Sequence, residues 1–92
     1  MTEGLGYRIN PHVVTSTYDE GEGVLIDLEN RRYFNLNETA MAIVRGVAEQ
    51  TSMEALIASL VSRYEVSAPT VQASVERTLR ELAVLGFVSP SR

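Results

Sequence analysis

The chain has no cysteine and a single histidine, and each scarcity excludes a class of site. Without cysteine there is no disulfide, no thiolate zinc site and no cysteine nucleophile. His12 has no second histidine to join it at a metal. The sequence also lacks the G-x-S-x-G motif of serine hydrolases and a glycine-rich loop for phosphate. We therefore expect a protein that is not an enzyme and that needs no metal or cofactor.

Long apolar runs and positive charge are scarce as well. No stretch approaches the roughly 20 apolar residues of a membrane-spanning helix, and residues 1–10 do not resemble a signal peptide. The net charge of -4 repels nucleic acid and anionic lipid. With 45% hydrophobic residues, the 92-residue chain is expected to form one small domain, ordered over about residues 11–88. We expect it in the cytoplasm, bound to neither nucleic acid nor membrane.

Three segments have the β-branched, aromatic and aliphatic residues of strands: Val13–Tyr18, Val24–Leu28 and Arg32–Leu36. An acidic loop with glycines, residues 19–23, follows the first. Glu29-Asn30-Arg31 joins the other two, and Asn30 is expected to adopt the left-handed conformation there. These short connections predict an antiparallel meander. Asp27 and Glu29 flank the second turn, where we expect solvated carboxylates rather than an acid and base pair.

Three amphipathic helices are predicted after the strands. Asn37 is expected to cap the first helix, the capping-box pattern of residues 51–54 to begin the second, and Ser67 to precede the third. Apolar residues at helical spacing mark the buried faces: Ala40, Ile43, Val44 and Val47; Met53, Leu56, Ile57, Leu60, Val61 and Tyr64; Val71, Val75, Leu79, Leu82 and Leu85. Gly46 is an unfavourable residue inside the first of these helices.

The third helix is expected to end at Gly86, with Phe87 folded back on its last turn and residues 89–92 frayed. The order of elements predicts an α+β fold: a three-stranded antiparallel β-meander is followed by three helices. The helical part resembles a winged helix-turn-helix.

A winged-helix shape raises the alternative of a DNA-binding regulator. The charges of the third helix are Glu76, Arg77, Arg80 and Glu81. Glu76 with Arg80, and Arg77 with Glu81, have the i, i+4 spacing at which side chains neutralise one another. DNA-binding helices usually present an unpaired basic stripe. The spacing therefore favours a solvated helix face over a recognition helix.

The last strand of a meander lies at an edge, where unpaired backbone groups can pair with another chain. Arg31 and Arg32 are charges that would discourage aggregation there. The functional alternative is β-augmentation, in which an extended peptide adds to this strand and packs against the third helix. The candidate peptide-binding residues are Arg31, Arg32, Tyr33, Phe34, Asn35 and Leu36 on the strand, and Val71, Ser74, Val75, Arg77 and Thr78 on the helix.

These candidate residues are not expected to have equal roles, and the face of the strand that meets the peptide stays open. Val75 is expected mainly to hold the fold, whereas Val71, Ser74 and Thr78 are better placed to touch a ligand. Alternation along the strand puts Tyr33 and Asn35 on one face and the even-numbered residues on the other, and either face could line the groove.

The segment GVLIDLENRRYFNLNETAMAIV, an S/T-x-x-E helix start, and RYEVSAPTVQASVERTLRELAVLGFV together resemble the PqqD-like family of RiPP recognition elements, over about Val13 to Val88. The most specific residues are Tyr33, Leu36, Asn37 and Glu38, supported by Tyr64, Val66, Val75, Leu79, Leu82, Gly86 and Phe87. The resemblance implies that the chain binds the leader region of a ribosomally made precursor peptide beside the third strand and third helix, and presents it to a modifying enzyme.

Within the family, the chain is most similar to the stand-alone leader-binding subunit of a split lasso-peptide peptidase. That similarity implies a partner cysteine protease that removes the leader, and a leader with a Tyr and Pro recognition motif. Similarity to PqqD itself implies a radical SAM partner in quinone cofactor biosynthesis. The residues of the chain leave both partners open.

Overall fold

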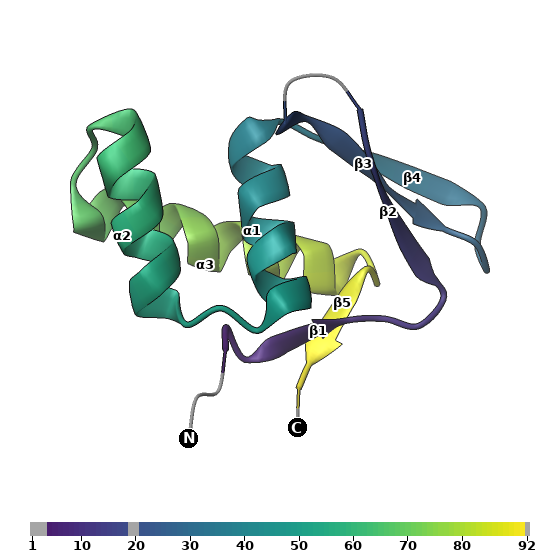
Figure 1. Cartoon of the computed structure of the whole chain (residues 1–92). Helices are drawn as coiled ribbons and strands as arrows, with labels where there is room; N and C mark the ends of the chain where they lie inside the picture. The colour runs from purple at the N-terminus through teal and green to yellow at the C-terminus, as the bar shows by residue number, and fades with distance from the viewer. Residues whose placement is uncertain (1–3, 19–20, 92) are drawn as a thin grey trace.

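The computed structural model of the chain describes residues 4–18 and 21–91 (Figure 1). Residues 19 and 20 of the predicted acidic loop lie outside this range. The elements follow one another in the order β1 (Tyr7–Ile9), β2 (Val13–Thr17), β3 (Gly23–Asp27), β4 (Arg32–Leu36), α1 (Glu38–Glu49), α2 (Met53–Tyr64), α3 (Ala68–Val84) and β5 (Val88–Pro90). None of the helices described is long and apolar enough to cross a membrane.

The predicted meander is confirmed, because β2, β3 and β4 form an antiparallel sheet in that order. Burial alternates along β3: Leu25 is buried on the face toward the helices, and Val24 and Ile26 are partly exposed on the other. α1 and the end of α3 therefore cover one face of the sheet, and α2 packs against these two helices on the side away from the sheet (Figure 1). The α+β class with three helices after the meander is as predicted.

The core has two clusters, and α1 contributes to both. One lies among the helices and consists of Leu5, Ile43, Val47, Leu56, Leu60, Val71, Val75 and Leu79. The other lies between the sheet, α1 and the end of α3, and consists of Val13, Leu25, Leu36, Met41, Val44, Leu82, Phe87 and Val88. Because α1 contacts both, it fixes the position of the sheet relative to α3.

The helix caps agree with the sequence at two of three starts. Asn37 caps α1 as predicted and accepts a hydrogen bond from the Ala40 N–H at 2.8 Å, and Ser67 precedes α3 as predicted and is its cap. The start of α2 was predicted one residue early, since Ser52 is the cap rather than Thr51. The reason is local: the N–H of Thr51 still donates to the Gly46 carbonyl at the end of α1, at 2.9 Å.

A second, two-stranded sheet joins β1 to β5, with Ile9 opposite Val88. The predicted fraying of the tail is therefore wrong for Ser89 and Pro90. Asn10 fixes this pairing, because its amide donates to the Gly86 carbonyl at 2.8 Å and its side-chain oxygen accepts from Ser89 Oγ at 2.7 Å. Gly86 has a φ of 89° just past α3, as its position in the sequence predicts.

Candidate functional site

The turn between β3 and β4 is built around a buried carboxylate. Asp27 is 0% exposed, so the prediction of a solvated side chain is wrong. Its Oδ1 accepts from the N–H groups of Glu29 and Asn30, and its Oδ2 accepts from Asn30 Nδ2, each at 3.0 Å. These bonds hold Asn30, and the left-handed residue is Arg31, with a φ of 58°, instead of the predicted Asn30.

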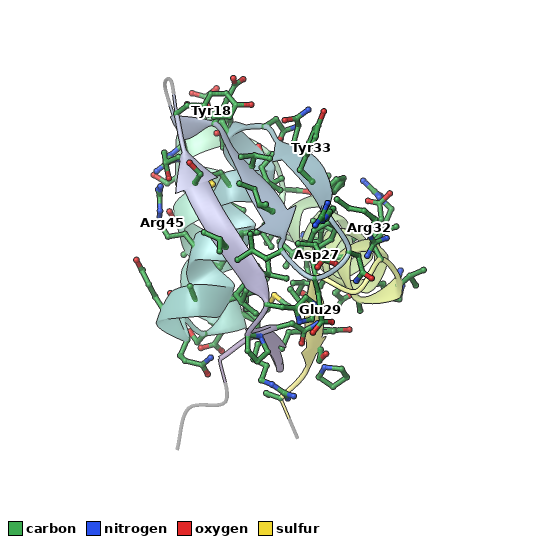
Figure 2. All side chains as sticks on the ribbon, turned by 90° about the vertical axis from the view of Figure 1, so that its right-hand side faces the viewer. Tyr18, Asp27, Glu29, Arg32, Tyr33 and Arg45 are labelled. Carbon is green, nitrogen blue, oxygen red and sulfur yellow. The ribbon has the colours of Figure 1, made fainter. Side chains whose placement is uncertain are left out.

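Arg32 connects this turn to the end of α3. Its Nη2 donates to Asp27 Oδ2 at 3.3 Å and also to the carbonyl of Leu85, and its guanidinium lies 5.5 Å from the centre of the Phe87 ring. Figure 2 places Asp27 and Arg32 together at the turn end of the hairpin, with Tyr33 farther along β4. Arg32 thus forms bonds within the fold, whereas the sequence suggested an unbonded charge that discourages aggregation at the edge.

The hydrogen bonds at this turn also set the ionisation of Asp27. Those from the Asn30 side chain and backbone have the largest effect, and those from Arg32 and Glu29 add to it. Together they lower the pKa of Asp27 far below its ordinary value, although burial acts in the opposite direction. The sequence predicted Asp27 only as a solvated carboxylate and not as the centre of the turn. An Asp followed three residues later by Asn at a strand end was the available signal, since Asp side chains bond nearby backbone in turns.

β4 pairs only with β3 among the strands that the structure describes, so its other edge is vacant, as predicted. In a strand, the N–H and C=O groups of successive residues point to opposite edges. The N–H of Leu28 donates to the His12 carbonyl, so even-numbered residues of β3 point toward β2 and odd-numbered ones toward β4. The odd-numbered residues of β3 are opposite the even-numbered residues of β4, so the even-numbered residues of β4 bond to β3. Tyr33 and Asn35 therefore direct their backbone groups to the vacant edge.

The side chains of β4 separate in the same alternating way. Leu36 is 2% exposed, and Phe34 is half-buried and stacks on Phe87, with ring centroids 6.0 Å apart and an interplanar angle of 20°. Tyr33, in contrast, is 72% exposed on the outer face of the sheet. The even-numbered residues thus face α3, which decides the question that alternation alone left open.

A depression of about 410 Å³ lies beside this edge, between β4, the start of α1 and α3. It brings together six of the predicted residues: Phe34, Asn35, Leu36, Ser74, Arg77 and Thr78. A second depression of about 320 Å³ continues toward the turn and contains Arg31, Arg32, Tyr33, Phe34, Leu85 and Phe87. Because Phe34 lines both, the two depressions adjoin along the strand, and together we call them the β4–α3 groove.

Two predicted residues lie outside the β4–α3 groove. Val71 and Val75 are only 5% and 0% exposed and belong to the core among the helices. They line a separate, smaller depression of about 190 Å³ beside Tyr64. Ser74 lines both that depression and the groove, so the two adjoin at the start of α3.

The sequence of residues 22–88 matches the family model described as coenzyme PQQ synthesis protein D (PqqD). The chain belongs to the PqqD family. The match spans β3, β4, the three helices and the first residue of β5, and therefore all residues of the β4–α3 groove. None of the curated protein sequences matches the chain.

Two solved structures resemble this PqqD-family chain, and both contain a leader peptide. TbiB1 in complex with the TbiA(beta) leader peptide is 28% identical, with a TM-score of 0.81 over 89% of this chain and 94% of that one. A lasso peptide synthetase B1 complexed with the leader peptide is 26% identical, with a TM-score of 0.85 over 94% of this chain and 100% of that one.

The charges of α3 in this PqqD-family chain are arranged differently from the prediction. Glu76 accepts a hydrogen bond from Gln72 at 3.2 Å. In residues 4–18 and 21–91, the salt bridge that forms is that of Asp27 with Arg32, and the His12 imidazole lies 3.8 Å from the same carboxylate, so the pairs expected along α3 are absent. Within that range there is also no group of three or more side chains that could hold a metal ion.

Proposed function

We propose that this PqqD-family chain binds the leader region of a ribosomally synthesised precursor peptide, which adds as a strand to β4 and packs against α3. The observation that carries the proposal is the vacant edge of β4, where Tyr33 and Asn35 direct backbone groups into solvent beside the β4–α3 groove. The leader-peptide complexes of two similar proteins support it.

The affinity for a peptide requires contacts in the β4–α3 groove as well as backbone hydrogen bonds at the edge of β4. Tyr33 and Asn35 offer two N–H and two C=O groups, and each backbone bond contributes only about 1 kcal/mol net of water. Association costs at least about 4 kcal/mol in lost freedom of motion, so these bonds alone give little affinity. The peptide must therefore also bury apolar side chains in the groove, where Phe34, Leu85 and Phe87 offer apolar surface.

The chain itself needs no bond chemistry in this function. A bound leader raises the local concentration of the precursor near an enzyme that recognises the core peptide poorly. The proposed partner is the leader peptidase of a lasso-peptide pathway, a cysteine protease, and the alternative is a radical SAM enzyme of quinone cofactor biosynthesis. We place leader cleavage and the radical SAM reaction alike in the cytoplasm. Addition of the chain should accelerate leader cleavage by the protease under the first assignment, and should leave it unchanged under the second.

The edge is tested by removing one outward N–H without altering the β3–β4 ladder. Asn35→Pro does this on β4, and Thr15→Pro makes the same change on the vacant edge of β2. The ligand is a fluorescently labelled leader peptide of a lasso-peptide precursor, and anisotropy measures its affinity. We expect Asn35→Pro to weaken binding at least tenfold and Thr15→Pro to bind as the wild type does.

This test has two controls. Asn35→Ala retains the N–H and separates the side chain from the backbone, and circular dichroism establishes that each variant is folded. Equal binding by folded Asn35→Pro and wild type would contradict strand addition to β4.

A further inference from the structure

On its α3 side, the β4–α3 groove carries one cation and one anion that do not form a salt bridge with each other. Arg77 and Glu81 both line the 410 Å³ depression. They are four residues apart on α3, which puts them on the same helix face. In the part of the chain that the structure describes, neither takes part in a salt bridge. Both charges are therefore available to a ligand in the groove.

The order of these charges along β4 follows from the direction of α3. The carbonyl of Leu85, at the end of α3, accepts from Arg32 at the beginning of β4. Of the two depressions of the groove, Ser74, in the first half of α3, lines only the one that extends to Leu36, whereas Leu85 lines only the one that extends to Arg32. α3 therefore runs opposite to β4. Arg77 lies nearer the Leu36 end of the groove and Glu81 nearer the Phe34 end.

The spacing of the two charges matches that of an extended peptide. Four helical residues advance about 6 Å along the axis, and two residues of a strand advance about 6.6 Å. In a strand added to β4, the residues opposite Phe34 and Leu36 are two apart and have their side chains on the face toward α3. Those two positions face Glu81 and Arg77.

We infer that the β4–α3 groove selects peptides in which an acidic residue and a basic residue are two positions apart in the added strand. The acidic residue lies toward Arg77, at the Leu36 end, and the basic residue lies toward Glu81, at the Phe34 end. The inference rests on the proposed function. Such partly exposed pairs contribute little affinity each, but a reversed or shifted peptide brings like charges together, so the pairs set direction and register.

The test exchanges the two charges. A displayed library of random 12-residue peptides is selected on the wild type, on the double variant Arg77→Glu/Glu81→Arg, and on the control Glu76→Arg/Arg80→Glu. The control makes the same exchange, at the same spacing on the same helix, with side chains that are exposed and line none of the depressions of the groove. Sequencing of the selected pools gives the charge pattern at each position.

We expect wild type and control to enrich one order of acidic and basic residues at a spacing of two, and the exchanged variant to enrich the opposite order. A wild-type peptide should bind the exchanged variant about tenfold more weakly, and a peptide with its own two charges exchanged should restore binding. The same charge order in all three pools, or no charge preference in a pool that binds the wild type, overturns the inference and leaves the proposed function standing. No enrichment on the wild type overturns both.

Discussion

Arg32 donates a hydrogen bond to the main-chain carbonyl of Leu85, a residue 53 positions later in the sequence. The bond joins the first residue of β4 to the cap of α3. Phe87 packs beneath the same guanidinium, at 5.5 Å from its ring centre. The strand and the helix that form the two sides of the groove are thereby connected at one end, which fixes the distance between them.

Replacing this connection should affect binding more than folding. We expect Arg32→Met to weaken leader binding roughly fivefold and to lower the melting temperature by about 5 °C, because the side chain is partly exposed and its bonds are partly replaced by water. Anisotropy and calorimetry measure the two effects. Arg45→Met makes the same change on the exposed face of α1, away from the groove, and serves as the control. Unchanged affinity in Arg32→Met would contradict a role for this bond in positioning the groove.

The ionisation of Asp27 should make the stability of the fold depend on pH in the acidic range. Its pKa is lowered in the folded chain relative to an ordinary value of 3.8, so its ionised form stabilises the fold above that pH. The contribution is lost as pH falls from the ordinary value through the lower pKa of the folded state. We expect Asp27→Asn to lower the melting temperature by roughly 10 °C at neutral pH. The difference from wild type should shrink between about pH 4 and pH 2.

Thermal unfolding at a series of pH values, followed by circular dichroism, measures this convergence. Glu29→Gln removes an exposed carboxylate from the same turn and controls for the general effect of charge. A difference between wild type and Asp27→Asn that stays constant down to pH 2 would show that the carboxylate is not stabilised in the way its hydrogen bonds indicate.

The local signals of the sequence were sufficient for most elements. Asn37 and Ser67 cap helices because a short polar side chain reaches the free N–H groups, and this depends on neighbouring residues alone. Gly86 ends α3 for an equally local reason, its positive φ. The edge position of β4 followed from the order of strands.

The features that the sequence did not predict depend on distant residues. β1 and β5 have three residues each, too few to show a period, and they pair across most of the chain. Asp27 is buried because the turn folds over it and Arg32 arrives from the next strand. The direction of the backbone groups of β4 requires the register of the whole sheet. The strand pattern alone suggests Phe34→Pro as a test of the vacant edge. That substitution is unsuitable, because the Phe34 backbone bonds to β3 and proline would remove a bond of the sheet itself.

Two glycines should respond oppositely to alanine. A Cβ on Gly46 would be 3.5 Å from Leu5 and 3.7 Å from Leu56, in ordinary contact, so helix propensity decides the effect. We expect Gly46→Ala to stabilise the fold by about 0.5–1 kcal/mol. A Cβ on Gly23 would be 2.5 Å from the Ser16 carbonyl and 2.8 Å from Met41 Sδ, and Gly23→Ala should cost about 1–3 kcal/mol. Chemical denaturation measures both, and destabilisation of similar size in the two variants would contradict the packing around Gly46.

Salt distinguishes peptide binding from the winged-helix alternative. Arg77 and Arg80 are interspersed with Glu76 and Glu81 on α3, and the whole chain has a net charge of -4, so DNA phosphates meet as much repulsion as attraction. A DNA-binding protein with several phosphate contacts loses about 10³–10⁵ in affinity between 50 and 200 mM salt. We expect leader binding to weaken by less than about tenfold over that range, because backbone bonds and apolar contacts respond little to ions and only two side-chain charges contribute. Anisotropy with labelled leader peptide and labelled duplex DNA measures both. Tight DNA binding with a steep dependence on salt would favour the regulator, since the vacant edge of β4 has no part in that function.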